Sequence, residues 1–525
     1  MMSNRNIDAL FQLIHSLEKS EKRNFKLYIK RNSNNEDLKV IELFDAIDKL
    51  NDYDEPLLLK KLSSIKKPQL SNIKTHLYKQ LLASLRLIKS SESIDLQLHE
   101  QLDYARILYN KGLYLQSLKI LERVKELAIS FNQDSFLIQV ISLEKKIENL
   151  YITRSIHNRA ERLTNEALEV NARRQQITML SNLALQLYSW YIKKGHARIE
   201  KDQSDIERFL HDNLPQNAFR LSGFYAKLYL YQSFSWYAFI RQDFLMYYRY
   251  TQKWVDLFVA QANMITVEPA HYIKGMHNLL NALYIIKNHE KFEITLNEFK
   301  AFALTPVANM YENNRIQTFV YISAASLNQH IMEGTFKNGL RLIPDIEEKL
   351  NLYHSYIDTH RILVFNYKIA GLYFGAGNFE KAIDYLNKII NGDIDLRLDL
   401  QCYARLLHLL AHYELGNYDL MQYLVKSVYR FMQKMENQTV IEKEMMNFLR
   451  ESLQKSPSEV KSDFKEFLKK IKKFETSRFE TRAFSYFDIV AWIESKVYDK
   501  PMSEIIMKKC KSRKKRIYAI YQRSE

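Results

Sequence analysis

The stretch LYFGAGNFEKAIDYLNKII, residues 372–390, holds the pattern that decides the fold. Two apolar runs flank Gly377, Asn378 and Phe379, and the small Ala382 follows three residues later. A glycine between two periodic apolar segments is typical of a tight turn, because glycine takes up left-handed backbone conformations without strain. The small alanine lets two antiparallel helices approach closely, and the neighbouring aromatic and aliphatic residues fill the space between them. The stretch therefore predicts a helical hairpin.

Similar spacing recurs along the chain. Three further turn glycines, Gly112, Gly334 and Gly416, each have an aromatic residue two positions later, as Gly377 does. Weaker turns are predicted at Gly195, Gln242 and Asn288. The interval from 112 to 195 has room for two units, with LYITRSIHNRAERL (residues 150–163) in its middle. These positions predict about eight helical hairpins in series.

The order aromatic, Gly, aromatic and Ala at these steps resembles the tetratricopeptide repeat (TPR), over roughly residues 95–435. A regular TPR unit has about 34 residues, and the units here are longer, so HEAT or armadillo repeats are the structural alternative. The resemblance implies an all-α fold, a right-handed superhelical solenoid of TPR-like hairpins with helical N- and C-terminal caps. It also implies a concave surface, lined by the first helix of each unit, that binds peptides or helices.

Composition agrees with a packed helical protein. Hydrophobic residues make up 46% of the 525 residues, while glycine and proline number only 11 and 8. Such scarcity of turn residues argues against an antiparallel β protein or a typical α/β enzyme. Two cysteines form no disulfide framework, which favours a reducing compartment. Neither a secretory signal nor an apolar run long enough to span a membrane is found, so we predict a cytoplasmic protein with no membrane span.

Three parts are predicted: an N-terminal helical module (1–94), the TPR-like solenoid (95–435) and a C-terminal helical region with a basic tail (436–525). In the N-terminal module, Asp54 with Pro56 predicts one helix start and Ser71 predicts the cap of a longer helix. We interpret this module as a bundle that caps the solenoid; a helix-turn-helix variant is the alternative.

The C-terminal region contains an amphipathic helix whose apolar stripe is expected to dock on the protein itself. Binding to a membrane or to a partner is the alternative. The stripe consists of Phe464, Phe467, Leu468, Ile471 and Phe474. In the helix that follows, Trp492 and Ile493 are expected to be buried.

Positive charge is concentrated at the ends of the chain. The net charge is +16, and residues 441–525 alone contribute 21 basic against 13 acidic residues, a net +8. Dense positive charge attracts phosphates without sequence preference, so the tail is a candidate anion or nucleic-acid site; a solubilising helix end is the alternative. The candidate residues are Lys508, Lys509, Lys511, Arg513, Lys514, Lys515 and Arg516.

No motif indicates catalysis. His408 and His412 are four residues apart, but Leu409 stands where a metalloprotease needs glutamate, so they are interpreted as core or groove histidines. Gly375 and Gly377 are explained by a helix crossing and a turn, because no phosphate-binding loop pattern surrounds them. The prediction is a non-enzymatic protein without catalytic residues, metal ligands or cofactors.

The repeat register implies which residues face the concave groove and bind a partner. They are Arg106, Tyr109, Gln232, Trp236, Tyr321, Asn328, Tyr367, Phe374 and Tyr413. The alternative for each is ordinary packing between repeats. The positions that form a basic carboxylate clamp in one TPR subtype hold no lysine or arginine here, so an apolar or helical peptide suits the groove better.

The leading functional prediction is a scaffold or adaptor that binds a protein or peptide in this groove. The alternative is a regulator that contacts nucleic acid through its basic termini while the array senses a partner. An enzyme with a site hidden in the solenoid is a third hypothesis, which no residue spacing supports.

Overall fold

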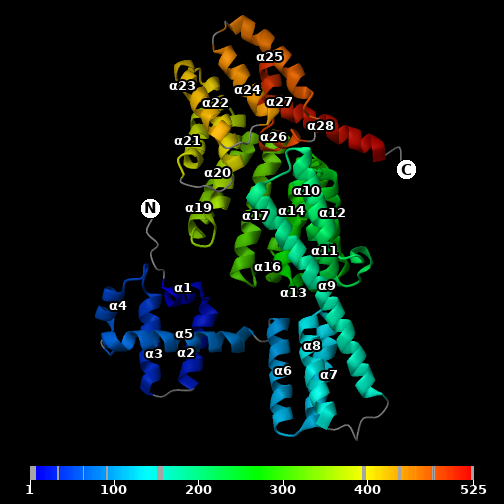
Figure 1. Cartoon of the computed structure of the whole chain (residues 1–525). Helices are drawn as coiled ribbons and strands as arrows, with labels where there is room; N and C mark the ends of the chain where they lie inside the picture. The colour runs from blue at the N-terminus through cyan, green and yellow to red at the C-terminus, as the bar shows by residue number, and fades with distance from the viewer. Residues whose placement is uncertain are drawn as a thin grey trace. The chain divides into compact units, whose positions relative to one another are not determined.

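The computed structural model describes residues 8–31, 35–62, 64–89, 93–150, 158–392, 398–434, 439–453, 455, 457–475, 477 and 479–521. Across these ranges every regular element is a helix, so the prediction of an all-α protein is confirmed. The chain divides into two compact units, residues 1–171 and 172–525 (Figure 1). The second unit thus contains the C-terminal region together with most of the predicted solenoid.

The first unit contains eight complete helices in its described part and the beginning of a ninth. They are α1 (Ala9–Ser16), α2 (Lys19–Arg31), α3 (Asn35–Asp48), α4 (Glu55–Lys61), α5 (Lys67–Lys89), α6 (Ile94–Asn110), α7 (Tyr114–Ser130), α8 (Asp134–Leu150) and α9 (Arg159–Lys194), which continues past residue 171. Helices α1–α5 share one hydrophobic cluster, and α6–α8 with the start of α9 share another.

The remaining helices belong to the second unit. They are α10 (Glu200–Asn213), α11 (Phe224–Ile240), α12 (Phe244–Ala260), α13 (Asn263–Val267), α14 (Pro269–Ile285), α15 (His289–Ala303), α16 (Pro306–Asn309), α17 (Glu312–Glu333), α18 (Phe336–Leu340), α19 (Ile343–Leu352), α20 (Thr359–Gly375), α21 (Phe379–Ile390), α22 (Leu398–Glu414), α23 (Tyr418–Lys434), α24 (Val440–Ser452), α25 (Pro457–Lys472), α26 (Thr481–Tyr486), α27 (Ile489–Tyr498) and α28 (Met502–Tyr521). Among the described residues, no helix is both long and apolar enough to cross a lipid bilayer.

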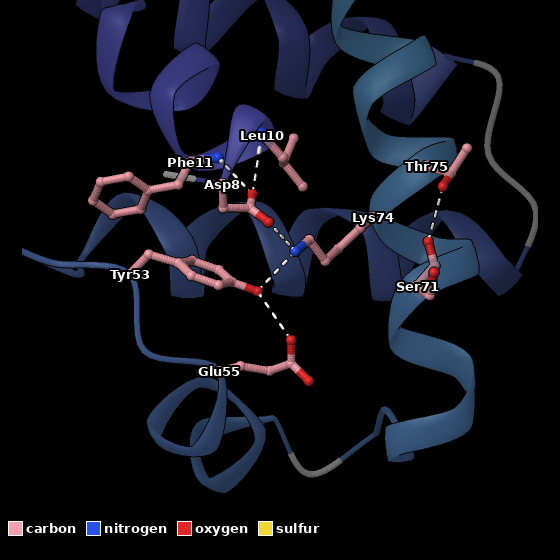
Figure 2. Close-up of polar contacts among 8 residues, drawn as sticks. All are labelled: Asp8, Leu10, Phe11, Tyr53, Glu55, Ser71, Lys74 and Thr75. Carbon is pink, nitrogen blue, oxygen red and sulfur yellow. Dashed lines mark hydrogen bonds and ion pairs between the residues drawn. The ribbon is translucent and has the colours of Figure 1, made fainter. Parts of the chain in front are cut away.

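The helix starts in the N-terminal module only partly follow the prediction. Helix α4 begins after Asp54, whose carboxylate accepts a hydrogen bond from the backbone N–H of Leu57 (3.0 Å), as expected of an N-cap. Helix α5 begins at Lys67, so the prediction that Ser71 caps it is wrong. Ser71 lies one turn inside the helix, where its carbonyl accepts a hydrogen bond from the Thr75 hydroxyl (Figure 2). Pro68, which suits a first helical turn, is the residue that marks the start of α5 in the sequence.

A polar network ties α1 and α5 to the segment before α4. Figure 2 shows the Lys74 ammonium between the Asp8 carboxylate and the Tyr53 hydroxyl, which in turn donates to Glu55 (3.4 Å). Burial alone would lower the pKa of Lys74, but its hydrogen bonds to Asp8 and Tyr53 outweigh that effect and raise the pKa. Asp8 also caps α1 by accepting from the backbone of Leu10 (3.1 Å).

Seven helix pairs in the described part of the chain share one turn geometry: α6–α7, α7–α8, α11–α12, α14–α15, α17–α18, α20–α21 and α22–α23. In each pair a residue with left-handed backbone is followed, two positions later, by the first residue of the second helix. The left-handed residues, with φ between 56° and 82°, are Gly112, Asn132, Gln242, Lys287, Gly334, Gly377 and Gly416. Five of the predicted turns therefore carry this geometry at the predicted position, including the non-glycine Gln242.

The turn predicted at Asn288 lies one residue earlier, at Lys287. Asn288 instead caps α15 by accepting a hydrogen bond from the backbone N–H of Lys291 (3.2 Å). Asn378 makes the same bond to Lys381 (3.1 Å) at the start of α21, so the two hairpins are equivalent. In the quoted stretch, Ala382 is fully buried.

The chain between α8 and α11 departs from this pattern. The expected turn within LYITRSIHNRAERL falls mainly on residues 151–157, which lie outside the described residues. Beyond them α9 runs unbroken for 36 residues, and Gly195, although left-handed, is followed by α10 only at Glu200. Elsewhere in the second unit helices that are close in the chain pack on one another, as α11 on α12, α12 on α14, α14 on α17 and α20 on α21. This sequential packing is that of a solenoid-like helical array.

The C-terminal region docks on this array, as predicted. Phe464, Phe467, Leu468 and Ile471 are buried on α25, and Trp492 and Ile493 are buried on α27. They belong to one hydrophobic cluster that also contains core residues of α17, α20, α21 and α22. Helix α28 returns to contact α15 and α17. The C-terminal helices and the array therefore form a continuous core.

Candidate functional site

A cavity of about 390 Å³ lies within the second unit. Its wall is assembled from α9, α11, α12, α14, α17, α20 and the C-terminal helices α26 and α28. Its volume falls in the range of about 300–1,000 Å³ that is usual for ligand sites. The first helices of several hairpins therefore converge on one cavity, which is the candidate site.

Aromatic rings form much of the wall. Trp236 of α11 lies against Tyr188 and Tyr191 of α9, with ring centroids 4.8 and 5.7 Å apart. Tyr321 of α17 stacks on His277 of α14 at 4.0 Å and 15°. These rings offer flat apolar faces and, at the tyrosines, polar edges.

Positive charge distinguishes this wall from an ordinary core. Five cationic side chains line it, Lys274, Lys287, Arg361, Lys368 and Lys509, against one carboxylate, Asp488. The Asp488 carboxylate already caps α27 by accepting from the backbone N–H of Ala491 (2.8 Å). Lys509 is paired with Glu494 (2.8 Å), outside the wall. The other cations of the wall are Lys274 of α14, Lys287 in the turn after α14, and Arg361 and Lys368 of α20, of which Arg361 lies 3.3 Å from Asp358.

Lys274, Arg361 and Lys368 line the cavity together with His277. Burial first, and then the charges of Arg361, Lys368 and Lys274, lower the pKa of His277 to about 3. Burial and the charge of Arg361 also lower the pKa of Lys274, whose ammonium lies over the rings of Tyr188 (5.2 Å) and Trp236 (6.0 Å). Arg361 donates to the Tyr321 hydroxyl (3.3 Å) and lies 3.3 Å from Asp358. The ring of His277 is thus neutral and lies in the same wall as three cations.

Four of the nine predicted groove residues line this cavity: Trp236, Tyr321, Asn328 and Tyr367. Asn328 accepts a hydrogen bond from the Lys368 ammonium (2.5 Å). Tyr367, only 7% exposed, donates to the backbone carbonyl of Tyr486 (3.4 Å), so its hydroxyl faces the C-terminal region. Whether these residues bind a partner stays a prediction.

The other five predicted groove residues lie elsewhere. Arg106 is exposed in the first unit, where it pairs with Asp103 (3.1 Å), and Tyr109 packs on Tyr114. Gln232 is buried and hydrogen-bonded to His271 (3.0 Å).

Phe374 and Tyr413 are covered by the chain's own C-terminal helices. Phe374 contacts Phe487, and Tyr413 contacts Phe464 and Trp492. For this pair the alternative of ordinary packing describes the position better than an open groove does.

The candidate basic tail is described only in part. Lys508 and Lys511 are on α28, and Lys509 points to Glu494 and the cavity. The side chains of Arg513, Lys514, Lys515 and Arg516 lie outside the described residues. At the other end of the chain, Lys74 is held by Asp8 and Arg86 lies 3.3 Å from Asp103.

His408 and His412 form a buried edge-to-face pair with ring centroids 4.5 Å apart. Burial, followed by the neighbouring His412 and Arg405, lowers the pKa of His408 to about 4. His412 is hydrogen-bonded to the side chain of Asn417 (3.0 Å). No group of three His, Cys, Asp or Glu side chains suited to a metal occurs in the part of the chain that is described.

Lys274, His277, Arg361 and Lys368 were not identified from the sequence. A signal exists in α14, where Lys274, His277, Asn278 and Asn281 follow helical spacing on an otherwise apolar helix. Polar residues on one face of such a helix indicate a wet or functional surface. Tyr486 and Asp488 join the cavity wall because the C-terminal region docks on the array. A single sequence carries no local signal for such docking between distant segments.

Comparison of the chain with protein-family models gives no match, and comparison with curated proteins gives none. The all-α fold and the sequence of packed helices agree with a helical repeat protein.

Acid should destabilise the second unit through its buried histidines. Burial is the main cause that lowers the pKa of His277 to about 3 and that of His271 to about 4, from the ordinary value of 6.5. Between these values and pH 6.5 the unfolded state therefore binds more protons than the folded state. Their contribution to stability is therefore present above pH 6.5 and is lost as the pH falls below it. The variant His277→Phe keeps a ring against Tyr321 and should show a shallower loss between about pH 7 and pH 5.

The measurement is urea unfolding followed by tryptophan fluorescence, because Trp190, Trp236, Trp254 and Trp492 all lie in the second unit. His211→Gln, at an exposed histidine, is the matched control. If the free energy of unfolding falls with pH as steeply in His277→Phe as in wild type, His277 does not contribute to the acid destabilisation.

Proposed function

We propose that the protein is a cytoplasmic, non-enzymatic scaffold or adaptor that binds a segment of a protein or peptide partner in the cavity of its second unit. The observation that carries this proposal is the convergence of Trp236, Tyr321, Asn328 and Tyr367 on one cavity. Rigid aromatic side chains supply contact area at low entropic cost, which suits recognition of peptide side chains. The proposal concerns binding rather than catalysis.

The proposal includes the TPR-like relation of the hairpins and their winding into a right-handed superhelix. It is supported by the shared turn geometry, in which a left-handed residue precedes the second helix by two positions. In such arrays the first helices of successive hairpins form the binding surface. The helices that supply the four residues, α11, α17 and α20, are first helices of their pairs.

The nucleic-acid regulator is the weaker alternative. Cations at both ends of the chain are engaged within the protein, Lys74 with Asp8 and Lys509 with Glu494. Truncating the tail should spare Cys510, which is buried near His289 (3.4 Å). A chain that ends after Ser512 keeps Cys510 and therefore tests the tail without removing this contact.

A photo-cross-linking amino acid at Tyr188 tests the proposal in cells. Tyr188 lines the cavity yet is 39% exposed, so a probe there reaches the cavity without entering the core. We expect it to cross-link a protein partner, and we expect Trp236→Ala to abolish the product. The same probe at Tyr423, an exposed tyrosine outside the cavity, is the control.

Nuclease treatment before isolation separates the two functions. Cross-linked protein that survives nuclease supports the scaffold, and products lost on nuclease treatment support the regulator. Identical products from the two tyrosine positions, or none from Tyr188, contradict binding at the cavity.

A further inference from the structure

Three cations of the cavity wall come from two neighbouring helices. Lys274 projects from α14, while Arg361 and Lys368 are seven residues apart on α20 and so lie on one face of that helix. All three line the same cavity as His277, and their charges lower the pKa of its imidazole. The wall contains a single carboxylate, Asp488, on a different segment.

Placing these three cations in one wall is electrostatically unfavourable, even with Asp358 3.3 Å from Arg361. Like charges in a partly desolvated space repel one another, and burial reduces the solvation and screening of these charges by water. Among the described residues no carboxylate lies within ion-pair distance of Lys274, and burial and Arg361 lower the pKa of its ammonium. Packing alone does not explain the cluster, because an apolar residue at 274 would fill the same space without the repulsion. A negatively charged group in the cavity would remove the repulsion.

We infer that the cavity binds an anionic group, a carboxylate or a phosphate, held between Lys274, Arg361 and Lys368. The inference rests on the proposed function in that the group is expected to belong to a peptide segment. Arginine offers paired donors to either anion, and the lysines add charge without fixed geometry. The charge of the wall thus selects acidic or phosphorylated segments over neutral ones.

The aromatic part of the wall defines the neighbouring portion of the ligand. Trp236 and Tyr188 lie beside Lys274, so an apolar or aromatic side chain next to the anionic group would contact their rings. A cavity of about 390 Å³ holds a few side chains and not a folded domain. The expected ligand is therefore a short segment with an aromatic residue adjacent to acidic or phosphorylated residues.

Three short peptides distinguish the chemistry: acetyl-Phe-Asp-Asp-amide, its phosphoserine counterpart acetyl-Phe-phosphoserine-Asn-amide, and the neutral acetyl-Phe-Asn-Asn-amide. Inorganic phosphate and citrate are tested beside them. Binding to the full chain is measured by calorimetry and by the fluorescence of the tryptophans, one of which, Trp236, is in the wall. We expect the two charged peptides to bind about 10- to 100-fold more tightly than the neutral one, as is usual for charge-assisted hydrogen bonds.

The variants Lys274→Met and Arg361→Gln should bind the charged and the neutral peptides with nearly equal affinity. Lys381→Met, at an exposed lysine paired with Asp384, is the matched control and should still bind the charged peptides more tightly. Lys274→Met should also raise the melting temperature of the free protein, because it removes repulsion while keeping an unbranched side chain. A melting temperature at or above that of wild type shows that lost binding is not lost folding.

The outcomes separate this inference from the proposed function. Equal binding of charged and neutral peptides overturns the anion site and leaves peptide binding standing. Binding of phosphate or citrate that depends on Lys274, without binding of any peptide or any cross-link at Tyr188, supports the anion site and contradicts a protein partner. No binding of any anion overturns the inference, while the Tyr188 cross-link still decides the proposed function.

Discussion

Gly375→Ala is expected to destabilise the second unit by about 1–3 kcal/mol or more. A Cβ atom at position 375 would lie within 2.5 Å of the Phe336 ring, far closer than side-chain carbons approach one another. Phe336 is 2% exposed and begins α18, so its ring cannot swing into solvent. Either the ring or the end of α20 must shift, and both belong to one hydrophobic cluster.

Gly371→Ala is the matched control, four residues earlier on the same helix. Its Cβ would meet only the Cδ1 atom of Ile331, at 3.9 Å, which is an ordinary contact. Because glycine in a helix interior costs up to about 1 kcal/mol relative to alanine, this variant should be neutral or stabilising. Urea unfolding followed by tryptophan fluorescence gives both values.

Combining Gly375→Ala with Phe336→Leu tests the cause. The double variant should lose less stability than the sum of the two single variants, since a smaller side chain makes room for the new methyl group. Strict additivity would mean that the ring of Phe336 is not what excludes a side chain at 375.

Local signals explain why the hairpins could be predicted from the sequence. Turn residues and the start of the following helix are a few positions apart, so the pattern at Gly377 could be carried to Gln242, which has a φ of 59° without being glycine. The same logic failed by one residue at Lys287, because Asn288 was aligned with the turn and not with its cap equivalent, Asn378. Attention to N-caps would have corrected the register.

The candidate site was predictable only where it depends on the repeat. Trp236 and Tyr367 were found because they lie on first helices, which face the inside of such arrays. Lysines such as Lys274 are more often solvated, so their convergence depends on which helices become neighbours. That Tyr486 closes over Tyr367 depends on docking between segments more than a hundred residues apart.

Trp492→Ala is expected to cost about 3–5 kcal/mol, the usual range for removing a buried tryptophan. Trp492 is 2% exposed and packs on Phe464 and Tyr413, with ring centroids 5.6 and 6.2 Å away. Its indole N–H donates to the Glu414 carboxylate (2.7 Å), which also binds the Lys496 ammonium (2.5 Å). The residue therefore joins α27 to the end of α22 by both packing and a hydrogen bond.

Trp492→Phe separates these two contributions. It retains an aromatic ring but leaves Glu414 with Lys496 alone, so it should cost less than Trp492→Ala, about 1–3 kcal/mol for the lost bond and volume. Equal losses in the two variants would show that the hydrogen bond to Glu414, and not ring packing, holds α27 in place.

Hydrogen exchange of Trp492→Ala shows whether the C-terminal helices and the array unfold together. Residues of α20, α22 and α27 belong to one hydrophobic cluster, so amides near Tyr367 and Phe374 should lose protection along with those of α27. Tyr486 and Phe487 contact these two residues, so their release should also open the cavity wall that Tyr367 lines. Loss of protection confined to α24–α28 would mean that the C-terminal helices fold separately, and the cavity would then lose one wall without disturbing the hairpins that carry Lys274 and Arg361.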